Sequence, residues 1–502
     1  METPGTSLPR GSFPQDFPAL GVTGVGGIQG KCFQEGWISA MTDAKGGWSL
    51  PSFWMSELAP LTRRPRLENS GSVDVAIVGG GFSGLWTALY LHELDPSLRI
   101  AVLEKEVAGY GASGRNGGWV CPFFPVGWGI VESIFGAETT RRFCEELVGT
   151  VDEVGARVAE LGIDCDYTKA GSISFMRNQA QVGHAEGDVK EIQRRGLAGD
   201  WRLLGAREAE AMLSVTYAHG ATFTPECATV HPARLVRGLA EAVESRGVEI
   251  YEDSQVSEVE DGYVRVGSAR LAASKIVVAT EGYTAGFDRW RRQVLPLYSM
   301  MIITEPLSDA QYEAIGSPTP GLCFADHRHL VIYGQITRDH RIAFGGRGAP
   351  YHLGSRVSRI HDTHGPSRDG LQRELLKLFP ALRGIRIVRH WGGPLGVSRD
   401  WLPRVAQEPN TQLWRIGGYA GDGVATTNLV GRVTARRLLG LADDSASAAV
   451  FARPPRDWEP EPFRWLGVNL GLNLTRVVDR LEDRGAPVAA LDRLRRTLIG
   501  QA

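Results

Sequence analysis

The chain has 502 residues, of which 43% are hydrophobic and 22% are charged, and its formal net charge is −2. This length exceeds one simple hydrophobic core, so two domains with extensions are expected. The near-neutral charge gives no electrostatic case for binding nucleic acid or a membrane surface, and no apolar run is long enough to span a bilayer. The composition is that of a soluble globular protein.

The N-terminal segment and the cysteines bear on cellular location. Residues 1–50 are rich in Gly, Pro and Ser and lack the basic and apolar regions of a signal peptide, which predicts a flexible extension with Met41 as an alternative start. The six cysteines show no C-x-x-C spacing, which argues against a zinc site or a disulfide framework. We therefore expect a cytoplasmic protein with no bound metal.

Residues 72–106 have the order strand, glycine turn, helix, strand. Residues 74–78 are a short apolar run typical of a buried parallel strand, and residues 79–84 read G-x-G-x-x-G. The glycines permit a tight turn, close approach to a pyrophosphate and close packing of helix on strand. Glu104 follows Gly84 by 20 residues, where a carboxylate can accept hydrogen bonds from a ribose. The pattern predicts a dinucleotide site that includes Gly79, Gly81, Phe82, Ser83, Gly84, Glu104 and Lys105.

A second glycine-rich loop, residues 109–119, follows directly and contains G-A-S-G-R-N-G-G. Taken alone, it could be a surface loop or a phosphate-binding turn of another enzyme. In this position it resembles the flavoprotein superfamily of D-amino-acid oxidase, glycine oxidase and sarcosine oxidase, and within it the gamma-glutamylputrescine oxidoreductase-like proteins. The resemblance implies FAD as the cofactor. It also implies that the pyrophosphate and the flavin ring lie along Ala112, Ser113, Arg115, Asn116, Gly117 and Gly118.

The resemblance continues from about residue 54 to residue 440. Residues 231–243 predict a helix with Pro232 in its first turn, followed by strands at 248–251 and 255–259. By resemblance, the backbone near Val256 meets the adenine, and Thr280 and Gly282 lie in a turn near the pyrophosphate. Residues 416–424 form a third glycine-rich segment, which precedes a predicted helix and which we call the closing turn. By resemblance, the flavin pyrimidine is contacted by Gly418, Gly421, Gly423 and Val424.

These segments predict an α/β fold with two domains. A Rossmann-type FAD-binding domain, discontinuous in sequence, is expected at 71–150, 225–290 and 390–445. A second, mainly antiparallel β substrate domain is expected at 151–224 and 291–389, with strands near 298–304, 329–333 and 341–344 and helices at 153–161 and 368–378. Residues 446–502 predict a proline-rich linker and two amphipathic helices, 463–484 and 488–499, which pack on the protein's own surface or form a dimer contact.

The resemblance also implies the chemistry. A C–H bond next to an amine nitrogen gives a hydride to flavin N5, and water hydrolyses the resulting imine. With no second G-x-G-x-x-G for a nicotinamide cofactor, electrons are expected to pass to O2 or another acceptor. The FAD is expected to be non-covalent because no cysteine lies in the closing segment. Cys121, which follows the flavin loop, is interpreted as a buried structural thiol.

Four residues are candidates for the catalytic pocket, although ordinary core roles fit each of them equally well: Tyr419, Trp391, Tyr333 and His390. An arginine that binds a substrate carboxylate is expected only for amino-acid substrates, and Arg338 and Arg347 are the candidates. An aliphatic amine or polyamine derivative is the preferred substrate class. Alternatives are an amino-acid oxidase or dehydrogenase of the glycine, sarcosine or D-amino acid type, a flavin enzyme of different chemistry, and a flavin-binding subunit of a heteromeric dehydrogenase. Oligomeric state is left open.

Overall fold

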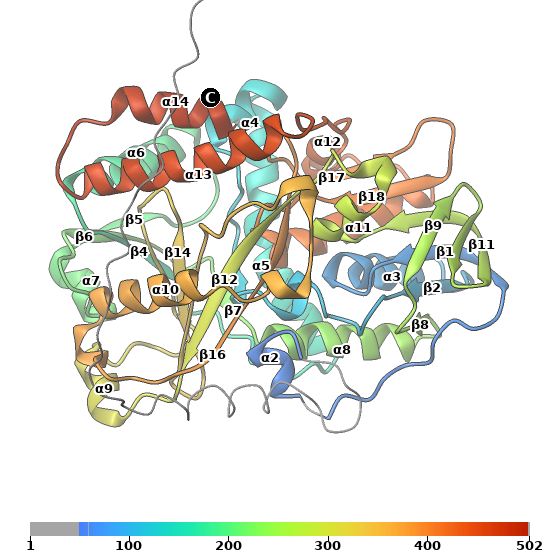
Figure 1. Ribbon diagram of the computed structural model, residues 1–502, viewed down its shortest axis with the longest axis horizontal. Coiled ribbons are helices and arrows are strands. Elements are labelled where there is room, and N and C mark those ends of the chain that lie inside the picture. The colour runs from blue at the N-terminus through green and yellow to red at the C-terminus, as the bar shows by residue number, and fades with distance from the viewer. Residues whose placement is uncertain (1–49, 59, 500–502) are drawn as a thin grey trace, which may run out of the picture. The chain divides into compact units, whose positions relative to one another are not determined.

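The computed structural model describes residues 50–58 and 60–499 (Figure 1). The predictions for residues 1–49, including the alternative start at Met41, lie outside the described residues. Two large β-sheets organise the described chain, and helices cover both of them. Within this part of the chain, none of the helices combines the length and apolar character needed to cross a bilayer.

The first sheet has the strand order β17-β18-β11-β1-β2-β8, and β9 and β10 extend it as a meander on β11. Its central pairs, from β18 through β11, β1 and β2 to β8, are parallel. The strands are β1 Gly71–Val78, β2 Ile100–Leu103, β8 Glu249–Tyr251, β9 Val256–Glu260, β10 Tyr263–Val266, β11 Ala269–Val278, β17 Arg404–Gln407 and β18 Leu413–Gly417. β2 and the last four residues of β1 are buried throughout, as expected for strands covered on both faces.

Helices pack against one face of this sheet through a continuous apolar core. They are α3 Phe82–Leu94, α5 Ala137–Glu160, α8 Pro232–Glu244, α11 Gly423–Leu438 and the short α4 Trp128–Phe135 and α12 Ala446–Phe451. The short helix α2 Phe53–Ser56 lies outside this core, with Trp54 against His231 and Trp391. α8 starts as the sequence predicts, with Pro232 in its first turn and His231 as the N-cap that accepts from the N–H of Arg234. A second apolar cluster fills the opposite face beneath the meander.

The second sheet has the order β16-β12-β15-β14-β13-β4-β6-β5, and all of its pairs are antiparallel except β13 with β4. Its strands are β4 Ser172–Met176, β5 Arg202–Gly205, β6 Gly220–Thr224, β12 Leu295–Thr304, β13 Cys323–Asp326, β14 Ile332–Ile336, β15 Ile342–Gly346 and β16 Ile387–Val397. A separate apolar core lies between this sheet and α7 Ala206–Met212, α9 Asp309–Ala314 and α10 Gly365–Leu378. A two-stranded ribbon, β3 Trp119–Val120 with β7 Ala228–Thr229, completes the strands.

Two of the predicted domain boundaries need correction. The boundary at 390 falls inside β16, which pairs along β12 and therefore belongs to the second sheet up to Val397. The boundary at 150 falls inside α5, which packs in the core of the first sheet. The periodicity of α5 reports only one buried face, so it could not show which sheet that face meets. The division into a cofactor domain and a substrate domain is otherwise still a prediction.

The two predicted C-terminal helices are α13 Phe463–Glu482 and α14 Ala489–Ile499. In Figure 1 both lie near α6 Gln179–Arg195, at one end of the second sheet. The hydrogen bond between Asn178, the N-cap of α6, and Asp483 confirms this proximity (2.9 Å). The C-terminal region therefore packs against the body of the protein.

Candidate functional site

The glycine turn between β1 and α3 is built from close backbone contacts. The N–H of Gly79 donates to the carbonyl of Leu103 at the end of β2 (2.8 Å). A Cβ at Gly84 would lie 2.1 Å from the carbonyl oxygen of Gly79, so only glycine lets α3 approach the strand this closely. α3 begins after Gly81, which has no side chain to cap the helix. The positive end of a helix dipole is therefore presented at this turn, as phosphate binding requires.

Glu104 lies against the same turn from the end of β2. Its carboxylate accepts hydrogen bonds from the N–H of Gly80 (2.9 Å) and from the N–H of Glu106 (3.0 Å). Burial raises the pKa of Glu104 to about 7, although both backbone donors act in the opposite direction. A carboxylate held in this way can accept further hydrogen bonds from a ribose.

The second glycine-rich loop folds back onto the first turn. The N–H of Gly109 donates to the carbonyl of Gly80 (3.0 Å), and Ser113 Oγ accepts from the N–H of Phe82 (2.9 Å). Asn116 closes the loop, because its Nδ2 donates to the carbonyl of Ser113 and its Oδ1 accepts from the N–H of Gly118. The two glycine segments thus form one continuous backbone surface.

Arg115 is a buried cation in this loop, with only 3% of its surface exposed. Its guanidinium forms an ion pair with Asp362 (2.7 Å) and donates to the carbonyl oxygens of Tyr110 and Gly392. Nη2 is buried and has no hydrogen-bond partner among the described residues. The sequence did not reveal Asp362, which is 247 residues away from Arg115 along the chain.

The closing turn joins β18 to α11 and rests on a buried acid, Glu281. Its Oε1 accepts from the N–H of Tyr419 (3.1 Å), and burial raises the pKa of this carboxyl to about 8. The hydroxyl of Tyr419 lies 2.7 Å from Ser83 Oγ on α3, which ties the closing turn to the first glycine turn. Glu281 was missed as a site residue, although an acidic side chain within the small-residue turn at 279–282 was a visible signal.

A cavity of about 550 Å³ opens between the second glycine loop, the closing turn, the second sheet and the C-terminal helices. Its polar and charged lining includes Arg115, Asn116, Ser299, Asp326, His329, Arg347, Asp422 and Arg495, and its apolar lining includes Trp119, Phe123, Leu295, Met301, Leu395, Val397, Trp401 and Trp458.

Tyr333 and Trp391 both lie against the second glycine loop. Tyr333 lines the cavity, and a Cβ at Gly117 would lie 2.5 Å from its ring, so the ring covers the backbone there. Its hydroxyl is 3.2 Å from Ser299 Oγ. Trp391 is buried behind the loop, where its Nε1 donates to the carbonyl of Arg115 (2.8 Å). Tyr333 therefore faces the cavity, and Trp391 supports the loop from behind.

The other two catalytic candidates lie elsewhere. His390 is adjacent to Trp391 on β16, and neighbouring residues of a strand point to opposite faces. Its ring nitrogens contact the carbonyl of Met301 (2.9 Å) and the N–H of His364 (3.0 Å), so the expectation that it faces the flavin ring is wrong. Tyr419 is buried beneath the closing turn and does not line the cavity.

The two candidate arginines separate clearly. The side chain of Arg338 is 79% exposed, pairs with Asp166 and does not line the cavity. Arg347 does line the cavity, and its Nη2 donates to the carbonyl of Ala420 in the closing turn (2.7 Å). Burial raises the pKa of Asp422, and the charge of Arg347 partly opposes this shift.

The remaining predicted cofactor positions are spread over the first sheet and the closing turn. Lys105 is exposed after β2, and Val256 is buried at the start of β9. Thr280 Oγ1 lies 2.9 Å from Thr284 Oγ1, and Gly282 lies against Pro394. Gly418 and Gly421 are in the closing turn, Gly423 begins α11, and Val424 lines the cavity.

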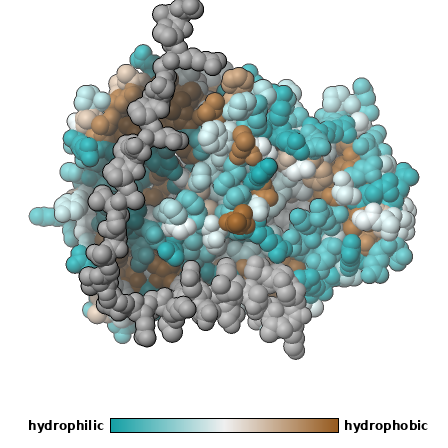
Figure 2. Space-filling model, in the orientation of Figure 1, coloured by the Kyte–Doolittle hydropathy of each residue, from teal (hydrophilic) through white to brown (hydrophobic). Residues whose placement is uncertain are grey.

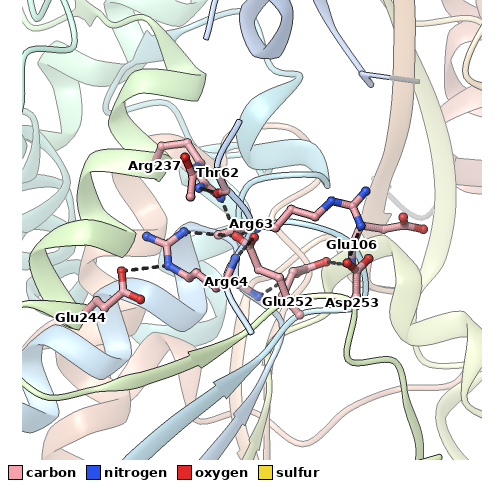
Figure 3. Close-up of polar contacts among 11 residues, drawn as sticks. Thr62, Arg63, Arg64, Glu106, Arg237, Glu244, Glu252 and Asp253 are labelled. Atoms are coloured by element: carbon pink, nitrogen blue, oxygen red, sulfur yellow. Dashed lines mark hydrogen bonds and ion pairs between the residues drawn. The ribbon is translucent and has the colours of Figure 1, made fainter. Parts of the chain in front are cut away.

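A buried ionic cluster supports the nucleotide end of the site (Figure 3). Glu252, which is fully buried after β8, pairs with Arg237 (2.5 Å) and Arg64 (3.1 Å) and accepts from the N–H of Ala108 (2.9 Å). Figure 3 shows Arg64 extending toward Glu244 and Arg237 reaching the backbone of Thr62. The cluster fastens residues 62–64 beside the segment that carries Glu104. It was not predicted, because its members are far apart in sequence.

One group of described side chains has metal-ligand spacing. The donor atoms of His184, His329 and Glu482 all lie within 4.8 Å of one another. Both imidazoles approach the same oxygen of Glu482 on α13. His329 Nε2 lies within hydrogen-bond distance at 3.2 Å, and His184 Nε2 of α6 lies at 3.6 Å.

Residues 74–437 match the sequence profile of the family described as DAO, FAD dependent oxidoreductase. The chain belongs to this family. Gamma-glutamylputrescine oxidoreductase of Escherichia coli is 29% identical over 387 residues, which cover 75% of this chain and 86% of that protein. A sarcosine oxidase subunit beta of an Arthrobacter species is 23% identical over 386 residues, which cover 70% and 85% of the two chains. The solved structure of glycine oxidase from Geobacillus kaustophilus superposes with a TM-score of 0.63 and 21% identity, covering 77% of this chain and 100% of that one.

Family membership confirms an FAD-dependent oxidoreductase, and the structural likeness confirms the predicted fold class. The residues present fit FAD. The uncapped start of α3 and the close glycine contacts suit a pyrophosphate, and Glu104 suits a ribose. Ala112, Asn116 and Gly117 of the second glycine loop and Ala420 and Gly421 of the closing turn line the cavity, which suits a flavin ring.

Proposed function

We propose that this enzyme oxidises the C–N bond of an aliphatic amine or polyamine derivative to an imine, which water then hydrolyses. FAD, when bound, supplies the acceptor for the hydride that leaves the carbon next to nitrogen. The protein's own residues bind and orient the amine, hold its charge and exclude bulk water. Electrons then pass to O2 or to another acceptor.

The main observation behind this proposal is that the arginines lining the cavity already have partners within the protein. Arg115 is paired with Asp362, and Arg495 is paired with Asp492 (2.6 Å). Arg347 donates to a carbonyl oxygen and lies beside Asp422. Each arginine that lines the cavity therefore already has an anionic or carbonyl partner, with which a substrate carboxylate would have to compete.

Asp422 gives the cavity a group that suits an amine. It lines the cavity at the start of α11, and its side chain does not cap that helix. A carboxylate here can hold the substrate ammonium before deprotonation. Tyr333, with its hydroxyl near Ser299, forms an aromatic wall next to the second glycine loop. Such a wall suits the methylene groups of an aliphatic chain.

Amino-acid oxidation is the second candidate, because Arg347 lines the cavity beside the closing turn. If its guanidinium left Ala420, it could accept a substrate carboxylate in a bidentate pair. The two candidates make opposite predictions for one variant. Arg347→Ala should leave flavin reduction by amines within about threefold if no carboxylate is bound, and should abolish reduction by amino acids if one is.

The deciding experiment is anaerobic bleaching of the bound flavin by polyamines, N-methyl amino acids and D-amino acids. We expect an amine to bleach it fastest, with a rate that rises with pH as the amine loses its proton, since only the lone-pair form donates hydride readily. Asp422→Asn should raise the apparent Kd for amines about tenfold with unchanged FAD content. Faster bleaching by glycine, sarcosine or a D-amino acid than by every amine would refute the proposal.

Several finer points are part of the same proposal. The FAD is non-covalent: Cys121 lines the cavity, but burial raises the pKa of its thiol, and a protonated thiol is a poor nucleophile. Acid precipitation should therefore release the yellow colour into the supernatant. The protein acts without a second subunit, so the purified chain alone should be bleached by substrate. The proposal includes a cytoplasmic location, and hydrogen peroxide release in air would identify O2 as the electron acceptor.

A further inference from the structure

The C-terminal helices enclose the cavity, although they lie beyond the family match, which ends at residue 437. Val468, Leu472 and Thr475 of α13 line it, spaced four and three residues apart, so they share one face of the helix. Arg495, Leu498 and Ile499 of α14 line it as well. We call these six residues the C-terminal wall.

The wall is fixed to the body at several points. The carboxylate of Asp479 accepts from the N–H groups of His329 (2.9 Å) and Leu330 (3.0 Å), which themselves line the cavity. Glu482 contacts His329, Asn469 contacts the backbone of Tyr351, and Trp401 Nε1 donates to the carbonyl of Ile499 (2.7 Å). Asn469, Asp479 and Glu482 hold α13 along its length, and the bond to Ile499 holds the end of α14, so the wall is attached to the body of the protein.

α13 has a second apolar stripe that faces away from the cavity. Phe463, Leu466 and Leu470 are 67%, 52% and 55% exposed, and none of them lines the cavity. Figure 2 shows apolar side chains at the upper left of this face, where Figure 1 places α13 and α14. The helix thus offers matched positions for the same substitution, one on each side.

We propose that the C-terminal wall is the specificity-determining element of this enzyme and selects substrates by the size of their apolar part. Val468, Leu472, Leu498 and Ile499 present aliphatic surface to the cavity. A substrate whose apolar segment reaches them gains burial, at roughly 25 cal/mol per Å². A bulkier segment meets side chains that the anchored helices cannot move aside. For the identity of the substrate, this inference rests on the proposed function, whereas the position of the wall does not.

The test uses the full-length, FAD-loaded protein and a homologous series of n-alkylamines. Leu472→Trp should lower kcat/KM at least tenfold for the longest amines and less than threefold for the shortest. Leu472→Ala should act in the opposite direction and improve branched or bulkier amines several-fold, an effect that misfolding cannot produce. Leu470→Trp, the control on the outer face of α13, should change kcat/KM for neither the longest nor the shortest amines.

A second measurement does not depend on any substrate. Iodide quenching of the bound-flavin fluorescence should fall in Leu472→Trp, rise in Leu472→Ala and rise further in Asp479→Asn, which loosens the anchor. If no amine bleaches the flavin but quenching follows this order, the proposed function fails and the wall stands. Equal quenching and equal length dependence in Leu472→Trp and Leu470→Trp would overturn the wall.

Discussion

The glycine turn between β1 and α3 and the C-terminal wall of the cavity are built under different constraints. At the turn, the critical contacts join backbone atoms, and Gly84 lies so close to the Gly79 carbonyl that no side chain fits. At the wall, the contacts come from aliphatic side chains such as Leu472 and Leu498, which other apolar residues of similar volume can replace. The turn therefore requires particular residues at fixed spacing, whereas the wall requires only shape. This difference explains why a cofactor site can be shared across a family while the substrate surface varies.

The largest expected effect on cofactor binding comes from adding one methyl group to the turn. Gly84→Ala places a Cβ 2.1 Å from the Gly79 carbonyl, so α3 must move away from β1. We expect colourless protein, with FAD affinity at least about 100-fold weaker, which corresponds to about 2.7 kcal/mol. FAD content after gel filtration measures the effect.

Gly183→Ala on α6 is the matched control, because a Cβ there meets nothing within 4 Å. This substitution should keep full FAD and raise stability by about 0.4–1 kcal/mol, through the lower entropy of the unfolded chain. Full yellow colour in Gly84→Ala would contradict the backbone-contact account of the turn.

The buried ionic cluster tests whether the nucleotide region also depends on non-local contacts. Glu252→Ala leaves Arg237 and Arg64 without their shared carboxylate in a buried setting, which should cost about 3–5 kcal/mol of unfolding free energy. Glu258→Ala removes a solvent-screened pair with Arg265 on the same sheet and should lower the free energy of unfolding far less. Urea unfolding measures both. Equal losses in the two variants would show that burial of the cluster contributes nothing.

The same comparison explains what the sequence could reveal. The strand–turn–helix unit, Glu104 and the second glycine loop are local patterns, in which spacing along the chain fixes spacing in space. Asp362 and Glu252 act through partners that are distant in sequence, and no local pattern reports such pairs. The C-terminal wall could not be predicted from the sequence either. The two amphipathic helices were predicted, but their apolar periodicity does not show which part of the protein the apolar face covers.

His390 shows a different limit. Periodicity places neighbouring residues on opposite faces of a strand, but it does not say which face of β16 meets the flavin loop. The side chain of Trp391 lies on the face that meets this loop and contacts Arg115, and the side chain of His390 lies on the opposite face. Choosing between them required the register of β16 on β12, which is a property of the whole sheet.

Glu281 should give the closing turn a pH-dependent stability. Its pKa is about 8 in the folded protein against an ordinary value of 4.5. Below about pH 4.5 the Glu281 carboxyl is protonated in both the folded and the unfolded protein, and its contribution to the free energy of unfolding is fully present. As pH rises toward 8, the unfolded state releases the proton first, so the free energy of unfolding falls by about 1.4 kcal/mol per pH unit, and above pH 8 the loss is complete.

Glu281→Gln stays neutral and should lack this slope. We expect the variant to gain about 2 kcal/mol relative to the native protein between about pH 6 and about pH 7.5. Thermal melts across that window measure the difference. Parallel melting curves for the two proteins would show that the carboxyl is already ionised at neutral pH.

The smallest expected effects come from removing the hydroxyl groups of two tyrosines. One lies beneath the closing turn and the other lies at the cavity surface. Tyr419→Phe removes the buried bond to Ser83 Oγ (2.7 Å), which ties the closing turn to α3. A bond of this kind contributes about 1 kcal/mol, so FAD affinity should weaken about fivefold while KM for substrate stays unchanged.

Tyr333→Phe removes a longer contact to Ser299 (3.2 Å) at the cavity surface, away from the nucleotide. It should change KM by two- to threefold and leave FAD affinity unchanged. Flavin fluorescence on dilution and steady-state kinetics separate the two quantities. If both variants altered FAD affinity alike, Tyr333 would support the cofactor, and the substrate surface would have to lie nearer the C-terminal wall.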